Sequence, residues 1–103
     1  MNRICLLKEV KRKVLEVTPK ADVILYGSRA RKASTSGSDW DFPILIDDNS
    51  NTLTDKIRHK IYEVEWATGE VLSSIVRNRK EWNSKRYKSL PFYKSVLRDG
   101  VRV

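Results

Sequence analysis

The sequence has very few residues that bind soft metals or form cross-links, with one cysteine, Cys5, and one histidine, His59. A single cysteine cannot form a disulfide within the chain, and zinc sites need a cluster of cysteine and histidine ligands. Any bound metal is therefore expected to be a hard cation held by oxygen atoms. The chain also lacks an apolar run approaching the roughly 20 residues of a transmembrane helix, which favours a cytoplasmic protein.

Acidic residues are outnumbered by basic ones: 13 Asp and Glu stand against 21 Lys and Arg, giving a formal net charge of +8. This excess favours phosphate-bearing partners or an acidic protein surface. Residues 77–80 and 85–88 form a basic cluster. The cluster is either a solvated surface or a region that docks an acidic partner or nucleic acid, and charge alone does not choose between these interpretations.

The length of 103 residues leaves no room for two domains that each bury a useful core, so we expect a single domain spanning residues 1–103. Thr52 and Asp55 resemble a capping box, and Pro43 favours either an edge position or a bulge for the strand that contains it. Apolar spacing and turn residues predict a helix over 2–18, a strand over 23–26, a short helix over 28–32, a strand over 40–46, a helix from Thr52 to Gly69, a strand over 71–77 and a helix from Pro91 to Gly100. This order predicts an α/β (α+β) fold, with helices packed on a small mixed β-sheet.

Gly27 and Ser28 directly follow the first predicted strand. A glycine there lets the backbone approach a ligand closely, and the amides of a following turn point toward any anion bound beside it. Ser28 adds a hydroxyl donor. Arg29 and Arg31 can both bind phosphate oxygens, but residues two apart on a helix do not share a face, and we favour Arg31.

Asp39 and Asp41 flank Trp40 at strand spacing, so their side chains are expected to project to the same face. Two adjacent carboxylates repel each other unless a cation neutralises them. Magnesium in proteins is commonly held by one or two carboxylates together with substrate phosphates. The sequence therefore predicts a site for a nucleoside triphosphate and a divalent metal, suited to in-line displacement at the α-phosphorus.

Gly27-Ser28, ten intervening residues and then Asp39-Trp40-Asp41 resemble the signature of the DNA polymerase beta-like nucleotidyltransferases. Residues 25–31 and 38–41 are most similar to the minimal nucleotidyltransferases of bacteria and archaea. The resemblance implies a nucleotidyltransferase-like fold that uses Mg²⁺ or Mn²⁺. It also implies transfer of a nucleotidyl group, usually AMP from ATP, with Ser28 on the phosphates and Asp39 and Asp41 on the metal.

The resemblance further implies a partner, because many such proteins are antitoxins paired with a HEPN-domain ribonuclease toxin. Some of them silence the toxin by adding AMP to a tyrosine hydroxyl. Family members also carry a third carboxylate on the next central strand, but this chain has no aspartate within residues 71–77. Glu70 is the best substitute as a third catalytic residue, while Glu63 and Glu65 fall within a predicted helix.

Two rival functions remain open from the sequence. The first is a catalytically silent nucleotide- or partner-binding module of the same fold, which the missing strand carboxylate supports. The second is a basic nucleic-acid-binding domain, which would bind in a salt-sensitive manner independent of Asp39 and Asp41. We rank it last because an acidic pair repels phosphate unless a metal intervenes.

Overall fold

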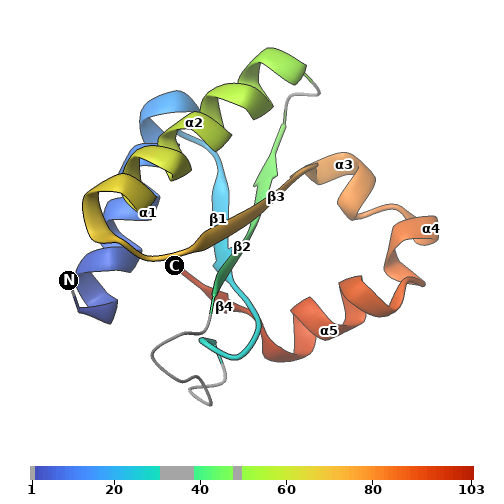
Figure 1. Ribbon diagram of the computed structural model, residues 1–103. Coiled ribbons are helices and arrows are strands. Elements are labelled where there is room, and N and C mark those ends of the chain that lie inside the picture. The colour runs from blue at the N-terminus through green and yellow to red at the C-terminus, as the bar shows by residue number, and fades with distance from the viewer. Residues whose placement is uncertain (1, 31–38, 48–49) are drawn as a thin grey trace.

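The computed structural model describes residues 2–30, 39–47 and 50–103, whose arrangement is shown in Figure 1. Within these residues four strands form one sheet, accompanied by five helices. In chain order the elements are α1 (Arg3–Val17), β1 (Asp22–Leu25), β2 (Trp40–Ile46), α2 (Asn51–Thr68), β3 (Leu72–Asn78), α3 (Arg79–Trp82), α4 (Lys85–Lys88), α5 (Pro91–Asp99) and β4 (Val101–Arg102).

The sheet has the strand order β3-β2-β1-β4. β2 runs parallel to β3 and antiparallel to β1, while β4 pairs antiparallel with the other side of β1. Helix α2 makes the crossover that a parallel pair requires. The predicted mixed sheet with packed helices is therefore confirmed.

The larger core lies between one face of the sheet and the helices α1 and α2. Strand side chains alternate between the two faces, and Trp40, Phe42 and Ile44 of β2 point into this core. Both helices carry apolar residues at three- and four-residue spacing, which gives each one a buried stripe. The buried helix residues are Leu6, Val10 and Val14 of α1 and Ile57, Ile61 and Val64 of α2.

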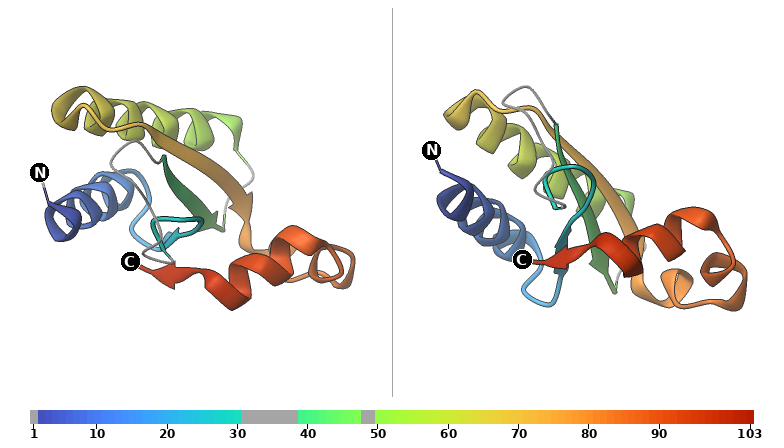
Figure 2. Two further views of the ribbon diagram at one scale, coloured as in Figure 1. Left: turned by 60° about the horizontal axis from the view of Figure 1, so that its bottom comes forward. Right: turned by 90° about the horizontal axis from the view of Figure 1, so that it is seen from below.

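A smaller core lies on the opposite face, where Leu45 of β2 packs against Trp82, Tyr93 and Val96 from α3 and α5. Figure 2 shows α1 and α2 on one side of the sheet and α3 to α5 on the other. Coverage of this second face is incomplete at the β3 edge, because Ile75 keeps 37% of its surface exposed. An open area thus remains beside the amino-terminal half of β2.

The helix ends follow ordinary capping chemistry, with one correction to the sequence analysis. α2 is capped by Ser50, whose side chain accepts a hydrogen bond from the Leu53 amide, rather than by Thr52. Gly69 ends α2 in the left-handed conformation, and Pro91 opens α5, both as predicted. None of the helices in the described ranges combines the length and hydrophobicity needed to cross a membrane.

Of the two alternatives that Pro43 suggested, the edge position is wrong, because β2 lies between β1 and β3. Asp41 accepts a hydrogen bond from Tyr26 of the β1 chain, so the alternate residue Pro43 also turns its backbone nitrogen toward β1. Proline has no N–H to donate there. The β1–β2 ladder is accordingly split into a paired segment at Val23 and Ile44 and a separate bridge between Tyr26 and Asp41.

Three further features differ from the sequence analysis. The described part of the expected helix over 28–32, residues 28–30, forms a turn. The charged segment after β3 contains two short helices, α3 and α4, and the last residues form strand β4. Strand β3 begins at Leu72, one residue later than expected.

Candidate functional site

The turn after β1 brings Gly27 into contact with Asp41 of β2. The amide of Tyr26 donates to the carbonyl of Asp41 at 2.9 Å, which fixes the end of β1 against β2. Gly27 has a φ of 82°, in the left-handed region that favours glycine. A Cβ atom at this position would lie 2.6 Å from Oδ2 of Asp41. The Asp41 carboxylate therefore lies directly against the Gly27 backbone, and two motifs separated in the sequence meet in space.

Ser28 occupies the turn that follows, which closes when the Ala30 amide donates to the Gly27 carbonyl at 3.1 Å. The Ser28 side chain is half-buried. In the part of the chain that the structure describes, neither its hydroxyl nor its amide has a hydrogen-bond partner. Both donors can therefore serve an anionic ligand bound beside the turn.

Asp39 and Asp41 form an acidic pair at the start of β2. Asp39 is exposed and Asp41 is half-buried. Burial raises the pKa of Asp41, and the negative charge of Asp39 raises it further. No hydrogen-bond donor or basic side chain within residues 2–30, 39–47 and 50–103 contacts either carboxylate. This pair is costly when ionised, and a bound cation would remove the cost.

The acidic pair fits a hard divalent cation with oxygen ligands. Asp39 and Asp41 supply two carboxylates, which matches the usual protein contribution to a magnesium site. No group of three or more Asp, Glu, His or Cys side chains in the described segments is arranged to hold a metal. The remaining ligands would therefore come from phosphate oxygens or water.

The structure describes only one of the two arginines that follow Ser28. Arg31, the residue favoured for phosphate binding, lies outside the described residues. The guanidinium of Arg29 lies 4.3 Å from the centre of the Trp40 ring, and its Nη2 lies 3.8 Å from Oε2 of Glu70. Its side chain keeps only 13% of its surface exposed. Arg29 thus contacts protein groups that the sequence analysis did not connect with it.

Glu70 lies at the junction of α2 and β3, on the Trp40 side of β2. Its Oε2 accepts a hydrogen bond from the Trp40 indole at 3.1 Å. Trp40 and Asp41 are consecutive in the strand, so their side chains project to opposite faces. The structure therefore brings Gly27 against Asp41, with Ser28 next to Gly27 and Asp39 close enough to raise the pKa of Asp41, whereas the side-chain contacts of Glu70 are with Trp40 and Arg29.

A cavity of about 210 Å³ lies beside Asp41, on the open part of the second sheet face. Ser73 stands opposite Asp41 in the parallel β2–β3 register, and both line this cavity. The other lining residues are Tyr26, Phe42, Pro43, Ile75 and Phe92. The sequence analysis missed Tyr26, Ser73 and Phe92, because only strand register and the packing of α5 bring them to Asp41.

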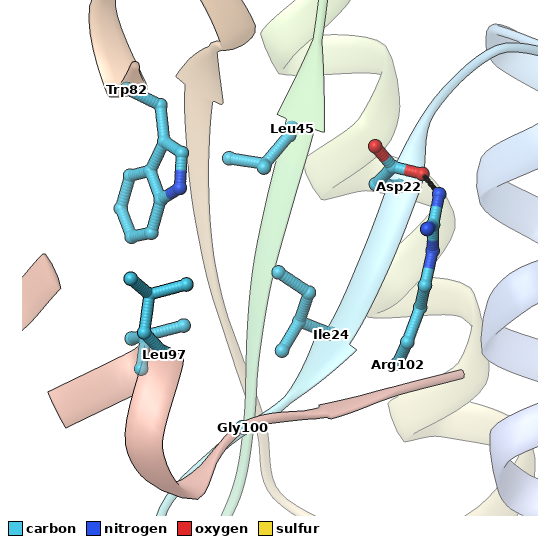
Figure 3. Close-up of a pocket in the computed structure, with 8 residues that line it drawn as sticks. Asp22, Ile24, Leu45, Trp82, Leu97, Gly100 and Arg102 are labelled. Atoms are coloured by element: carbon cyan, nitrogen blue, oxygen red, sulfur yellow. Dashed lines mark hydrogen bonds and ion pairs between the residues drawn. The ribbon is translucent and has the colours of Figure 1, made fainter. Parts of the chain in front are cut away.

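A second cavity, of about 240 Å³, lies elsewhere on the same sheet face, between β1, β2 and α5. Figure 3 shows its apolar wall of Ile24, Leu45 and Trp82, with an ion pair between Asp22 and Arg102 at its border. None of the sequence-predicted site residues lines it. The cavity beside Asp41 is therefore the one that matches the predicted chemistry.

Comparison with known families identifies the kind of domain that contains these residues. A family model described as a nucleotidyltransferase domain matches residues 6–98, which include every element from most of α1 to most of α5. No curated protein matches the sequence. The matched range contains the mixed sheet, the Gly27-Ser28 turn and the Asp39–Asp41 pair. The chain belongs to the nucleotidyltransferase domain family, within the DNA polymerase beta-like superfamily.

Proposed function

We propose that this nucleotidyltransferase domain binds a nucleoside triphosphate with Mg²⁺ or Mn²⁺ and transfers the nucleotidyl group, AMP from ATP, to a protein hydroxyl. The observation that carries the proposal is that Asp41 of the acidic pair touches the turn that holds Ser28, while among the described residues the pair contacts no donor and the Ser28 donors contact no acceptor. Negative charge and free donors at one place suit a metal–triphosphate complex better than either ion alone. The contact between Gly27 and Asp41 links the two motifs directly.

Each part of the site has a distinct task in this proposal. The amide and hydroxyl of Ser28 donate to phosphate oxygens, and Gly27 lets those oxygens approach the backbone. Asp39 and Asp41 would hold the cation, which supplies charge neutralisation at the phosphates and the reacting oxygens. Arg31 is retained as a phosphate ligand in the proposal. The site thus orients the triphosphate and leaves one side of the α-phosphorus open to the acceptor.

The nucleoside is expected to lie in the cavity beside Asp41. Tyr26 and Phe92 make an edge-to-face contact there, with ring centres 5.7 Å apart, and Ile75 adds apolar surface. Such a lining favours the flat face of a base through stacking and apolar contact. Backbone groups rather than charged side chains would then set the base preference.

The transfer step is balanced as a displacement at the α-phosphorus. The oxygen of the acceptor hydroxyl forms a bond to this phosphorus, and the bond from phosphorus to the oxygen that bridges the α- and β-phosphates breaks. Pyrophosphate leaves with that oxygen, and the acceptor proton passes to a base or to water. Glu70 is the base that the sequence suggests, although its contacts lie on the Trp40 side of β2, and a tyrosine hydroxyl is the proposed acceptor.

The proposed partner is a HEPN-domain ribonuclease, with the chain acting in the cytoplasm as its antitoxin. The family resemblance suggests this partner, and the basic surface favours a protein with an acidic face. Lys80, Lys85, Arg86 and Lys88 of α3 and α4 are all exposed and make no ion pair with described residues. They are available for such a contact.

One observation favours a second function, a silent nucleotide- or partner-binding module. The strand position next to Asp41 holds Ser73 rather than a carboxylate. Positioned acid–base groups typically contribute about 10²- to 10⁴-fold to a rate. Without one at this position, the chain would bind nucleotide and cover its partner with little or no transfer.

The test compares ATP labelled at the α-phosphorus with ATP labelled at the γ-phosphorus, incubated with Mg²⁺, the chain and a purified HEPN-domain protein. Nucleotidyl transfer places only the α-label on the acceptor, and Asp39→Asn abolishes it. Asp55→Asn, another exposed aspartate, serves as the control that leaves it unchanged. Transfer of the γ-label would contradict the proposal, and absence of both labels despite measurable ATP binding would favour the silent module.

A further inference from the structure

Three side chains from separate parts of the chain meet beside the phosphate-binding turn. Arg29 stacks over Trp40 at 4.3 Å, the Trp40 indole donates to Oε2 of Glu70 at 3.1 Å, and Arg29 approaches the same oxygen at 3.8 Å. Trp40 is only 4% exposed. A guanidinium over an indole face and an indole N–H on a carboxylate are both favourable, and burial strengthens them. We name these three residues the Trp40 cluster.

The Trp40 cluster joins the elements that carry the candidate site. Arg29 belongs to the same turn as Gly27 and Ser28, while Trp40 is the residue between Asp39 and Asp41. Glu70 comes from the α2–β3 junction, where its amide donates to the Thr68 hydroxyl at 3.2 Å. The Trp40 amide also donates to the carbonyl of Val71 at 3.0 Å, so the start of β2 is tied to the same junction.

The turn is also held from a second side. The Nη1 atom of Arg3, the first residue of α1, donates to the carbonyl of Arg29 at 2.6 Å. The backbone and the side chain of Arg29 are therefore fixed by different elements. This arrangement restrains the turn without using the hydroxyl of Ser28 or the carboxylates of Asp39 and Asp41.

We infer that the Trp40 cluster positions the phosphate-binding turn against the acidic pair, and that Glu70 is a positioning residue rather than the base for the acceptor. The inference rests on the proposed function for the ligand, but its structural part holds in the free protein. Glu70 contacts the indole on one side of β2, whereas Asp41 lines the cavity on the other. A base must reach the acceptor hydroxyl, which needs the cavity side. A residue that holds the turn through Arg29 must instead lie on the same side of β2 as the Trp40 side chain.

The two roles predict different effects of Glu70 substitutions on the Kd for nucleotide. Loss of a positioning residue lets the turn drift from Asp41, so Glu70→Ala should raise the Kd for Mg²⁺–ATP by about tenfold. Glu70→Gln should restore most of the affinity, because its amide oxygen still accepts the indole N–H. Loss of a base instead leaves Kd unchanged, and the glutamine variant is then as inactive as the alanine variant.

The experiment measures Kd for Mg²⁺–ATP and the NMR signal of the Trp40 indole N–H, assigned with Trp40→Phe, in native chain, Glu70→Ala and Glu70→Gln. Glu81→Gln, an exposed glutamate of α3, is the matched control. The expected result is a shifted, faster-exchanging indole N–H and weaker binding in Glu70→Ala only. The indole signal is recorded without nucleotide, so it tests the cluster even where the native chain binds no ATP.

Several results would overturn the inference. An indole N–H unchanged in Glu70→Ala would show that the hydrogen bond does not form in solution. An unchanged Kd in a folded Glu70→Ala variant that binds ATP would show that the cluster does not position the turn. Equal loss of transfer in both Glu70 variants, with Kd unchanged and the acidic limb of the pH–rate profile removed, would identify Glu70 as the base.

Discussion

At the scale of single residues, the contact between Gly27 and Asp41 decides whether the site can form. Gly27 has a left-handed backbone conformation, and a carboxylate oxygen of Asp41 lies only 2.6 Å from the position that a Cβ atom would take. Either feature alone disfavours a side chain, and here both act on the same atom. The acidic pair and the turn over residues 27–30 therefore meet at one small residue.

Gly27→Ala should weaken Mg²⁺–ATP binding by at least about tenfold, since the new methyl group displaces Asp41 or the turn. It should also cost about 1 kcal/mol of folding free energy through backbone strain. Gly69→Ala is a close control, because Gly69 has a similar φ of 73° with nothing near its Cβ position. Titration calorimetry that finds equal affinities for both variants would contradict the assigned contact.

Asp41→Asn should raise the melting temperature at neutral pH in the absence of divalent metal. Burial raises the pKa of Asp41 in the folded protein, so the ionised form is less favourable there than in the unfolded chain. Its favourable contribution is complete below the ordinary aspartate pKa and is lost as pH rises through the raised value. The gain should therefore disappear at about pH 3.

Scanning calorimetry at both pH values, with and without Mg²⁺, checks this prediction. Mg²⁺ should stabilise the native chain but not Asp41→Asn. Asp55→Asn, at an exposed position on α2, should change the melting temperature little. A native chain that is more stable than Asp41→Asn at neutral pH without metal would contradict the predicted cost of the ionised pair.

At the scale of elements, the parallel register of β2 and β3 determines which residues surround Asp41. It sets Ser73 beside Asp41 and Ile75 beside Pro43, on the sheet face that α5 leaves partly open. A shift of one residue would turn Ser74 to this face instead. The crossover through α2 and its end at Gly69 therefore bear directly on the chemistry of the site.

Ser73→Asp should raise the transfer rate by about tenfold or more, because it places a general base next to Asp41 on the cavity side. Ser73→Asn has nearly the same shape without the charge and should give no gain. The measurement is initial transfer of the α-label to the HEPN-domain acceptor, at saturating ATP. A Ser73→Asp variant that binds ATP like the native chain but transfers no faster would show that the rate is not limited by a base at this position.

Most of the helices and strands could be predicted from the sequence, and the physical reason differs from one element to another. The two long helices could be predicted because apolar residues such as Val10 and Val14, or Ile57 and Ile61, recur at helical spacing. These same residues are buried in the larger core. The contact of Gly27-Ser28 with Asp41 followed from strand–turn–strand order. The edge alternative for Pro43 was wrong because a local break in the β1–β2 ladder accommodates the missing donor inside the sheet.

The features that escaped prediction depend on contacts distant in the chain. Strand β4 forms only because Arg102 and Val101 pair with β1. Glu70 was chosen by its place at the start of a strand, but its direction is set by the Trp40 indole. The role of Ser73 depends on register, which no local pattern encodes.

At the scale of the whole molecule, a network of ion pairs joins segments that are far apart in the sequence. Asp22 of β1 pairs with Arg102 of β4 and, at 3.0 Å, with Arg79 of α3, which also pairs with Asp47 after β2. Burial alone would favour protonated Asp22, but hydrogen bonds from Arg79 and Arg102 outweigh it and lower the pKa of this carboxyl. The network thus links β1, the edge strand β4 and the end of β2 with helix α3.

Asp22→Asn should lower the free energy of unfolding by about 1 kcal/mol at neutral pH, since it removes the charge that pairs with the partly buried Arg79 and with the exposed Arg102. The lowered pKa means that the native contribution is present above the ordinary aspartate value of 3.8 and is lost as pH falls below it. Urea unfolding at neutral and acidic pH measures both effects. A midpoint that matches Asp55→Asn at neutral pH would argue against a stabilising network.

The central claim is that Asp39 and Asp41 make nucleotide binding depend on a divalent metal, and titration calorimetry with ATP tests it most directly. The native chain and an Asp39→Asn, Asp41→Asn double variant, shown to be folded by circular dichroism, are titrated with and without Mg²⁺. We predict binding by the native chain with Mg²⁺, weakened at least about tenfold when either the metal or the two carboxylates are removed. Equal affinity in the double variant, or no binding by the native chain, would contradict the proposed site.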